Sequence, residues 1–417
     1  MTRERRATYH LYTFLVSKLF GSVGASIYTF GISMFILSMT GSAFNFAINL
    51  VIAFIPRIVL SPVIGTLIDK YYMHKKRFVL IGELVEIATI ASLLLYTMMN
   101  GLSVMAVYIV TAIVTIASTV SSIAFSASIA NLVDEERLQK AMAFQQISGS
   151  VAGILGPIIG GMLFGFTTMS VFLAIHVAFN VVTFLLESTM DFNLYSTLTE
   201  PSAPQSMKQS LLEGYTYLMQ HHLLVRIFIL AVAVNFFFAC LSVGGDFILL
   251  ELIGLTPQQI GITEAASAVG MLVMSVAFSA IAQLKQPAQL TKYAIVGLGV
   301  LIMVFSLPLF IDLSQTMSFL FYSSAMFIFG VCIILTNMPI GLLLQTTIEE
   351  EYRGRVFGLL ETCAMSMMPI STLLFGILFD VVDARWILIG CGVASIICVF
   401  VTLPARVLRI QLREEHT

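Results

Sequence analysis

The sequence predicts an all-α integral membrane protein whose twelve transmembrane helices form two parallel-related six-helix halves. Three observations predict it. Of the 417 residues, 58% are hydrophobic and only 11% are charged, whereas about a quarter of the residues in a soluble domain are charged. The apolar residues gather into runs long enough to cross a bilayer. The second half of the chain repeats the first.

The apolar runs give the helices in order. A spanning helix needs about 20 apolar residues, and twelve such runs lie at 11–38, 44–67, 77–99, 102–130, 139–165, 168–190, 223–251, 257–282, 291–312, 316–345, 355–380 and 385–405. Short turns separate them at Thr40-Gly41-Ser42, Asn100-Gly101 and Thr256-Pro257. The first run is too long for a signal peptide and lacks a small-residue cleavage site, so we expect a retained helix.

The cations predict the orientation of these helices. With the N-terminus inside, 17 Lys and Arg residues fall in inner segments and Arg385 alone falls in an outer one. Because cationic loops stay on the cytoplasmic side, we expect cytoplasmic termini and a multi-pass protein of the plasma membrane. The cations are spread over short loops and the formal net charge is −2, which gives no sign of a nucleic-acid partner.

One long inner segment divides the chain. Residues 191–222 join an N-terminal half, 1–190, to a C-terminal half, 223–417. Residues 196–206 contain two prolines and are typical of a flexible linker. Residues 209–221 carry apolar side chains at helical spacing, which predicts an amphipathic helix on the inner membrane surface.

The two halves share a repeat. The segment Leu132-Val-Asp-Glu-Glu-Arg-Leu-Gln-Lys140 aligns without a gap with Thr347-Ile-Glu-Glu-Glu-Tyr-Arg-Gly-Arg355. The same offset along the chain places Gly161 on Gly376 and Gly82 on Gly297. Parallel six-helix repeats are the architecture of a large class of transporters, with the substrate site between the halves near mid-membrane.

Several motifs carry a resemblance to a known family. They are Gly65-x-Leu-x-Asp69-Lys70…Lys75-Lys76-Arg77, Gly156-Pro157-x-x-Gly160-Gly161, Met39-Thr40-Gly41-Ser42-Ala43, Leu132-Val-Asp-Glu-Glu136, Glu213-Gly214-Tyr, Ile262-Thr-Glu264 and Tyr352-Arg-Gly354-Arg355-Val-Phe357. The first is similar to the signature of the major facilitator superfamily between helices two and three, and the second to its antiporter motif. The others resemble the macrolide-efflux branch of twelve-helix drug:proton antiporters. The signature loop is about two residues longer than usual, with Tyr72 and Met73 where the pattern has Gly or Asp and then Arg.

The resemblance implies a bacterial, proton-coupled exporter of amphipathic small molecules such as macrolides, working by alternating access as a monomer in the lipid bilayer. Its partners would be the small-molecule substrate and protons. No enzyme motif, phosphate loop or metal-ligand cluster stands in the sequence, and the five cysteines are isolated within apolar runs. We therefore expect no enzyme activity and no cofactor, and transport driven by an ion gradient.

Two motifs have a functional and a structural interpretation. In the signature loop, Asp69 would lock the inner ends of the halves and release on rocking, although it could be an ordinary interfacial acid. The antiporter motif removes a backbone donor and side-chain bulk. It would seal the cavity against leak, or simply permit close helix packing.

The pathway candidates are polar side chains within the apolar runs. In helix one Lys18, Ser22, Ser26 and Thr29 share a face, as do Thr115, Ser118 and Ser122 in helix four, and Arg57, Asn235 and Asn337 complete the set. Hydroxyl stripes also join membrane helices. The family fold, which places helices one, four, seven and ten around the cavity, favours a pathway lining.

Acids within the membrane are the candidates for proton coupling. Asp246 and Glu264 lie at similar depth on consecutive helices joined by a short outer loop, so they could meet and share a proton. A satisfied polar contact is the alternative. For Glu83, Glu86, Glu187 and Glu361, near inner helix ends, we expect interfacial or gating pairs with loop cations rather than ligand contacts.

His176 and Asn180 share a face of helix six, where we expect a buried hydrogen-bonded pair.

The cationic side chains Lys18 and Arg57 near the pathway motivate an alternative cargo, an anionic metabolite or siderophore exported by the same mechanism.

Overall fold

The computed structural model describes residues 3–71, 74–195, 215–279 and 286–404. These ranges are helical and contain no strand. The elements are α1 (Arg3–Thr40), α2 (Ala43–Lys70), α3 (Lys75–Asn100), α4 (Val104–Ser126), α5 (Ile129–Leu132), α6 (Glu135–Phe166), α7 (Met169–Ser188), α9 (His222–Phe247), the π-helical turn η2 (Ile248–Leu252), α10 (Pro257–Ser279), α11 (Pro287–Val304), the short η3 (Leu307–Leu309), α12 (Gln315–Thr347), α13 (Glu350–Val381) and α14 (Ala384–Thr402).

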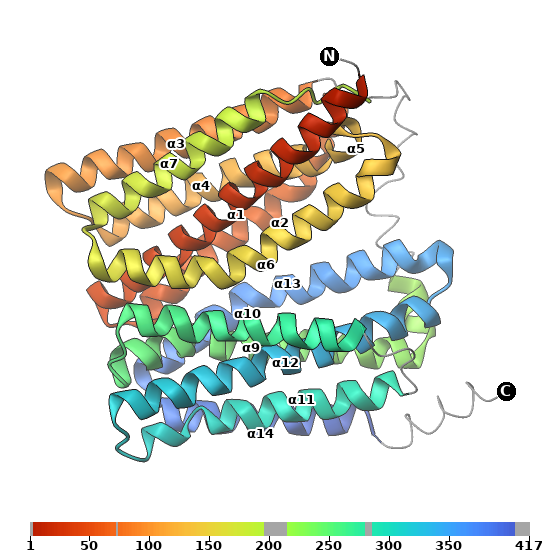
Figure 1. Cartoon of the computed structure of the whole chain (residues 1–417). Helices are drawn as coiled ribbons and strands as arrows, with labels where there is room; N and C mark the ends of the chain where they lie inside the picture. Colours follow the sequence, from red (N-terminus) through yellow and green to blue (C-terminus); the bar gives the residue numbers. More distant parts are fainter. Residues whose placement is uncertain (1–2, 72–73, 196–214, 280–285, 405–417) are drawn as a thin grey trace. The chain divides into compact units, whose positions relative to one another are not determined.

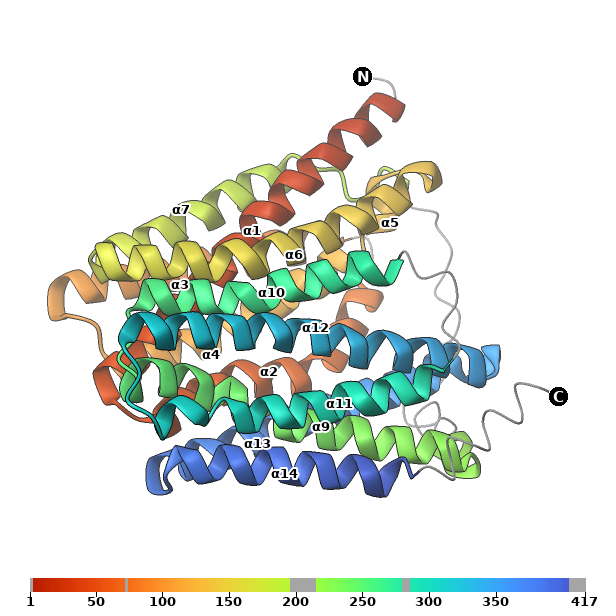
Figure 2. The same cartoon turned by 60° about the horizontal axis from the view of Figure 1, so that its bottom comes forward.

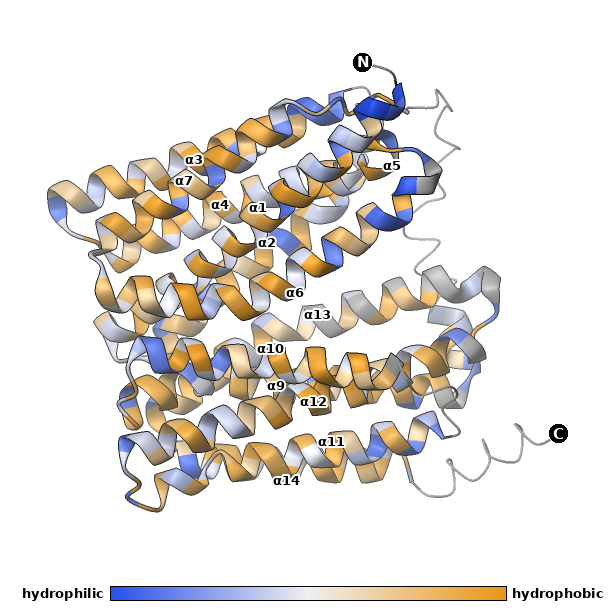
Figure 3. Ribbon diagram, viewed as in Figure 1, coloured by the Kyte–Doolittle hydropathy of each residue, from blue (hydrophilic) through white to orange (hydrophobic). Residues whose placement is uncertain are grey.

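The membrane-spanning character of these helices is confirmed. Among the described residues, eleven helices are long and apolar enough to cross a bilayer, and α13 contributes a shorter apolar segment, Ser366–Val381. Figure 3 shows apolar residues along the middle of the helices and hydrophilic residues gathered mainly toward their ends. This distribution follows from the bilayer, where only helices and closed barrels satisfy their own backbone hydrogen bonds.

The helices differ from the sequence prediction in several places. Helix α1 begins at Arg3, well before the predicted apolar run, so its cationic first turns are helical too. The run predicted at 102–130 is divided, because α4 ends at Ser126 and α5 begins at Ile129. Of the predicted amphipathic helix, only residues 215–221 are described, and residues 215–220 are helical. Tyr217 and Leu218 of this turn are buried in an apolar cluster with α12 and α13.

The predicted turns are confirmed at two glycines. Gly41 and Gly101 have φ values of 58° and 76°, a left-handed conformation that glycine adopts without a steric penalty. A third such residue, Gly254 with φ 73°, lies in the turn before α10. The predicted break at Thr256-Pro257 is confirmed too, since Thr256 lies in this turn and Pro257 is the first residue of α10.

The repeat is visible in the helix boundaries. Helices α6 and α13 begin at Glu135 and Glu350 and end at Phe166 and Val381, which are equivalent positions of the repeat. The packing repeats as well: α3 lies against α4 and α7, and α11 lies against α12 and α14 (Figures 1 and 2). In the same way α1 packs on α6 and α7, and α9 packs on α13 and α14.

The aligned glycines mark equivalent helix crossings. A Cβ atom on Gly82 would come within 2.8 Å of the Ala117 carbonyl oxygen, where α3 crosses α4. A Cβ on Gly297 would lie 3.6 Å from the Cys332 sulfur, where α11 crosses α12. The repeat also places Ala117 on Cys332. Both halves therefore bring the same pair of helices together at the same residue, more tightly in the first half.

The chain forms two compact units. The first consists of residues 1–40, 48–202 and 256–265, and the second of residues 41–47, 203–255 and 266–417. The start of α10 thus belongs to the unit formed mainly by α1 to α7, and the start of α2 belongs to the unit formed mainly by α9 to α14. Gly161 of α6 packs closely against Pro257, and Gly376 of α13 packs closely against Ala47.

The cations of the signature loop hold helix ends in the first unit. The Lys75 ammonium donates to the Ala127 carbonyl at 2.8 Å, just past the end of α4. The Lys76 ammonium donates to the carbonyls of Ser188 and Met190, at 2.6 and 2.9 Å, at the end of α7. The last carbonyls of a helix lack partners within it and carry partial negative charge. Both lysines therefore cap helix C-termini.

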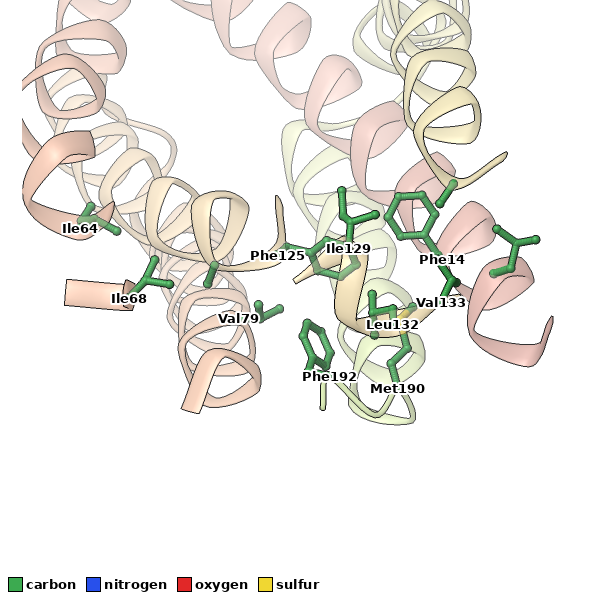
Figure 4. Close-up of a cluster of buried hydrophobic side chains, with 13 residues drawn as sticks. Phe14, Ile64, Ile68, Val79, Phe125, Ile129, Leu132, Val133, Met190 and Phe192 are labelled. Atoms are coloured by element: carbon green, nitrogen blue, oxygen red, sulfur yellow. The ribbon is translucent and has the colours of Figure 1, made fainter. Parts of the chain in front are cut away.

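These caps lie at the end of the first unit that contains a cluster of 13 buried apolar residues. Figure 4 shows the cluster, in which Phe14 and Phe125 stack at 5.6 Å between ring centroids and Phe125 meets Phe192 edge-on at 5.5 Å. Met190, which accepts from Lys76, belongs to it. The side chains of Asp69 and Lys70 are outside the described residues, so the proposed Asp69 latch stays a prediction.

The second unit has an equivalent cap. The Lys292 ammonium of α11 donates to the Leu403 carbonyl at 2.8 Å, just past the end of α14. The repeat places Ser188 on Leu403, so the same carbonyl is capped in both halves. The cap is therefore part of the six-helix fold itself.

We expect Lys76→Met to destabilise the protein by about 1–2 kcal/mol, because the half-buried end of α7 loses a charged donor. The midpoint of thermal unfolding in detergent would fall, as followed by a thiol-reactive dye for which the buried Cys240 is a reporter. Lys76→Arg should retain most of the stability. The control is Lys140→Met on the exposed face of α6; an equal loss in that variant would contradict the capping role.

The antiporter motif lies at two close helix contacts within the first unit. A Cβ atom on Gly156 would collide with the side chain of Ser26 in α1. A Cβ on Gly160 would lie 3.1 Å from the Phe30 ring and 3.2 Å from the Ile27 carbonyl oxygen. On the α10 side, the Pro157 carbonyl faces Gly261 so closely that a Cβ there would overlap it. The motif permits the helix backbones to approach, as the structural interpretation expects.

The variant Gly156→Ala should therefore cost about 1–3 kcal/mol of stability through overpacking. Gly149→Ala in the same helix is the matched control, since no heavy atom lies within 4 Å of its Cβ position. Adding Ser26→Gly to Gly156→Ala should restore the unfolding temperature. A Gly156→Ala protein as stable as the Gly149→Ala protein would show that this contact is not tight.

Candidate functional site

The first unit contains a polar cavity of about 420 Å³ between α1, α2, α3, α4 and α7. This volume lies within the range of ligand pockets. Its lining consists of Ser17, Lys18, Gly21, Ser22, Ala25, Ala53, Arg57, Glu83, Glu86, Thr115, Ser118, Thr119, Ser121, Ser122, Asn180, Thr183 and Glu187. Five of these side chains are ionisable, although charges within membrane helices are costly and mark function.

The cavity brings together most of the pathway residues predicted in the first half. Lys18, Ser22, Arg57, Thr115, Ser118 and Ser122 all line it. Ser26 and Thr29 do not: Ser26 lies against Gly156, and the Thr29 side chain is exposed. The stripe on helix one thus divides into a cavity-lining part and a part that packs or faces outward. That these residues contact a substrate stays a prediction.

The hydroxyl groups of α4 are oriented by their own helix. Thr119 donates to the Thr115 carbonyl at 2.6 Å, Ser118 to the same carbonyl at 3.2 Å, and Ser122 to the Thr119 carbonyl at 3.2 Å. Such bonds use the hydroxyl proton and leave the oxygen lone pairs available as acceptors. This wall of the cavity consequently offers acceptors rather than donors.

One ion pair connects α1 with α7. The Lys18 ammonium lies 3.7 Å from Glu187 Oε1, and the Glu187 side chain is only 1% exposed. Ser17 donates to the same oxygen at 2.7 Å. The Lys18 ammonium also lies over the Phe125 ring, 3.5 Å from its centroid, which is a cation–π contact.

The other two carboxyl groups come from α3. Ser121 of α4 donates to Glu83 Oε1 at 3.2 Å, and Glu86 lines the same cavity as Asn180 of α7. Both carboxyl groups are close enough to Glu187 for their charges to interact. The expectation of pairs with loop cations is wrong for Glu187, since its partner is Lys18. The sequence signal for this cluster was the presence of three acids within apolar runs.

The predicted pair on α7 is confirmed. Asn180 Nδ2 and His176 Nε2 are 3.1 Å apart, and both side chains are buried. The His176 ring stacks on Tyr28 of α1, with 4.5 Å between ring centroids. This pair joins α7 to α1 directly beside the cavity, which Asn180 lines.

The second unit has a cavity of about 340 Å³ between α9, α13 and α14, and part of its lining is equivalent to part of the polar cavity's lining. It is formed by Phe228, Ile229, Val232, Ala233, Phe236, Phe237, Met367 and Cys398. In the repeat, Val232, Ala233, Phe236 and Phe237 are equivalent to Ser17, Lys18, Gly21 and Ser22. One fold therefore presents a charged cavity in one unit and an apolar cavity in the other.

The remaining candidates lie outside both linings. The Asn235 side chain donates to the Ala231 carbonyl of its own helix at 2.9 Å, and Asn337 is exposed on α12. Asp246 is half-buried next to the last residue of α9, where the chain passes into η2. Such π-helical turns are frequent at functional sites. Glu264 is half-buried in α10 and belongs to the other compact unit, so the proposed pairing of the two acids stays a prediction.

Solved structures share this fold. A bacterial homologue of the iron transporter ferroportin, in an inward-facing state, matches with a TM-score of 0.70 and 16% identity, covering 94% of this chain and 98% of the other. The peptide transporter POT matches with a TM-score of 0.71 and 12% identity, covering 98% and 99%. At this identity the likeness concerns the fold alone.

Sequence comparison gives the family. The chain is 25% identical over 363 residues to Macrolide efflux protein A of Streptococcus pyogenes, with 85% of each chain covered. It is 26% identical over 329 residues to Macrolide efflux protein A of Enterococcus faecalis, covering 77% of this chain and 97% of the relative. The profile of the Major Facilitator Superfamily matches residues 15–372. With this match, the repeated six-helix units and the signature loop, the chain belongs to the Major Facilitator Superfamily of membrane transporters.

Proposed function

We propose that this transporter exports amphipathic, cationic small molecules such as macrolides in exchange for protons, by alternating access. The chain's membership of a transporter superfamily and its relatives named as macrolide efflux proteins support export. The observation that carries the choice of cargo is the polar cavity of the first unit, in which carboxyl groups outnumber cationic groups. In a low dielectric, such an excess attracts a positively charged ligand.

The apolar cavity of the second unit supports an amphipathic cargo. Its phenylalanines and Met367 form an apolar, adaptable surface. Methionine and aromatic side chains are typical of sites that accept varied apolar molecules. The polar cavity of the first unit fits the charged group of an amphipathic cation. The apolar cavity of the second unit fits its hydrocarbon surface.

An anionic cargo is less consistent with the contacts of Lys18. Its ammonium already has a carboxylate partner in Glu187 and an aromatic partner in Phe125. Arg57 remains as a cation lining the cavity, but three carboxyl groups line it as well. An incoming anion would meet more negative than positive groups.

Replacing both cationic residues, as Lys18→Met with Arg57→Gln, tests the two cargo classes. We expect export of a cationic macrolide to continue, because the cavity keeps its three carboxyl groups. Efflux from cells that express each variant, with surface levels matched, gives the measurement. If the unaltered protein exports an anionic siderophore-type compound but no macrolide, and the double variant loses that export, the anionic cargo is favoured instead.

For proton coupling we propose Asp246 and Glu264. Each is a carboxyl group within a membrane helix, a kind of residue that commonly takes part in proton relays. The sequence has no nucleotide-binding motif, and an ion gradient is the other common source of energy for uphill transport.

The variants Asp246→Asn and Glu264→Gln should abolish macrolide transport driven by an imposed pH gradient in liposomes, because neither side chain can then carry a proton. Exchange of labelled macrolide without a gradient should continue. Asp312→Asn, in the exposed segment before α12, is the control and should retain driven transport. If both coupling variants transported as fast as the control, these acids would not carry the proton.

A further inference from the structure

The ionisable groups of the first unit's cavity are unbalanced. Two cationic side chains, Lys18 and Arg57, face three carboxyl groups, Glu83, Glu86 and Glu187. With all five ionised, the lining has one negative charge in excess. An uncompensated charge within a membrane protein is costly, so one additional positive charge, either a proton on a carboxyl group or a bound cation, would balance the cavity.

One carboxylate oxygen identifies where a ligand would bind. Both polar contacts of Glu187, from the Ser17 hydroxyl and the Lys18 ammonium, are made to Oε1. Its other oxygen, Oε2, is buried and has no hydrogen-bond partner among the described residues. A buried acceptor without a partner costs free energy, and Glu187 lines the cavity. Rotation of the carboxylate toward the cavity would let a donor there satisfy Oε2.

The fold does not require this cluster. At the positions that the repeat makes equivalent, the second half has Ala233 for Lys18, Leu298 for Glu83, Leu301 for Glu86 and Thr402 for Glu187. The same helices nevertheless pack on one another there, and the lysine cap on the last helix is kept. A six-helix unit therefore forms without these charges. In the first unit their role is to interact with a ligand rather than to stabilise the fold.

The Lys18 ammonium is held loosely. Its distance of 3.7 Å from Glu187 Oε1 exceeds that of a direct hydrogen bond. The centroid of the Phe125 ring lies 3.5 Å from the Lys18 ammonium. This cation–π contact is a second stabilising contact that does not involve the carboxylate. The side chain is 24% exposed, so it has room to move along the cavity wall.

We propose that Glu187, together with Glu83 and Glu86, binds a protonated amine of the exported molecule, and that Lys18 competes with this amine for Glu187 when the cavity is empty. The ligand class is an organic monocation with an N–H donor, small enough at its charged end to enter a cavity of about 420 Å³. The amine donates to Glu187 Oε2 while Lys18 keeps its contact with Phe125. This inference rests on the proposed function for the nature of the cargo.

A binding experiment on the full chain in lipid nanodiscs tests it. The probes are a macrolide with a protonated dimethylamino group, the same macrolide made neutral by acylation of that nitrogen, and an unrelated lipophilic ammonium dye that carries an N–H group. The variants are Glu187→Gln, Lys18→Met and the double variant, with Asp312→Asn as the control. Gel filtration of each variant verifies that it is folded.

The two single variants should shift cation binding in opposite directions. Glu187→Gln should weaken binding of both cationic probes at least about tenfold, because a charge-assisted hydrogen bond is lost. Lys18→Met should strengthen it several-fold, because the competing cation is removed. The neutral macrolide should bind all variants alike. The double variant, which leaves no buried ion unpaired in this contact, should bind cations as weakly as Glu187→Gln.

A structural role for the ion pair predicts a different result. Weakening by both single variants, or equal shifts for the neutral and the cationic macrolide, would overturn the inference. Failure of the wild-type protein to bind either cation would overturn it too. Proton-driven transport in liposomes is measured separately. If the Glu187→Gln variant exports macrolides and binds them with unchanged affinity, the proposed function stands and the proposed binding site at Glu187 is wrong.

Discussion

The whole architecture depends on satisfying backbone polar groups where no water can do so. Within a bilayer each helix bonds its own amides, but its last carbonyls remain without partners. In both units a lysine from the start of one helix reaches the carbonyls past the end of another: Lys76 caps α7 and Lys292 caps α14. These contacts fix where the third and sixth helices of each unit meet. The cavity of the first unit lies between helices positioned in this way.

The internal repeat separates what the fold needs from what has been added to it. Glycine crossings occur at equivalent positions of both units, and a lysine caps the equivalent carbonyl in each. The polar groups of the first unit's cavity, by contrast, are not repeated. The second half has Ala233 at the position of Lys18 and Thr402 at the position of Glu187. One duplicated scaffold thus carries two chemistries, and the difference between the halves locates function more sharply than either half alone.

Glycine residues of the antiporter motif permit close helix packing. At Gly156 and Gly160 the absence of a side chain permits α1 to approach α6, and the carbonyl of Pro157 reaches Gly261. The proposed seal against leakage would require the same close contact. Ser26, predicted to line the pathway, instead fills the space that Gly156 leaves.

The sequence by itself determined the helices, most of their boundaries to within a few residues, the repeat and the transporter class, because bilayer thickness dictates the length and composition of each span. It also indicated most of the polar residues of α1 and α4 that line the cavity of the first unit. Only the tertiary structure decided that Lys18 pairs with Glu187, that Glu83 and Glu86 face the same cavity, and that Ser26 packs on Gly156. Helical periodicity gives the face on which a side chain lies. Which neighbouring helix that face meets depends on long-range packing, which no local pattern contains.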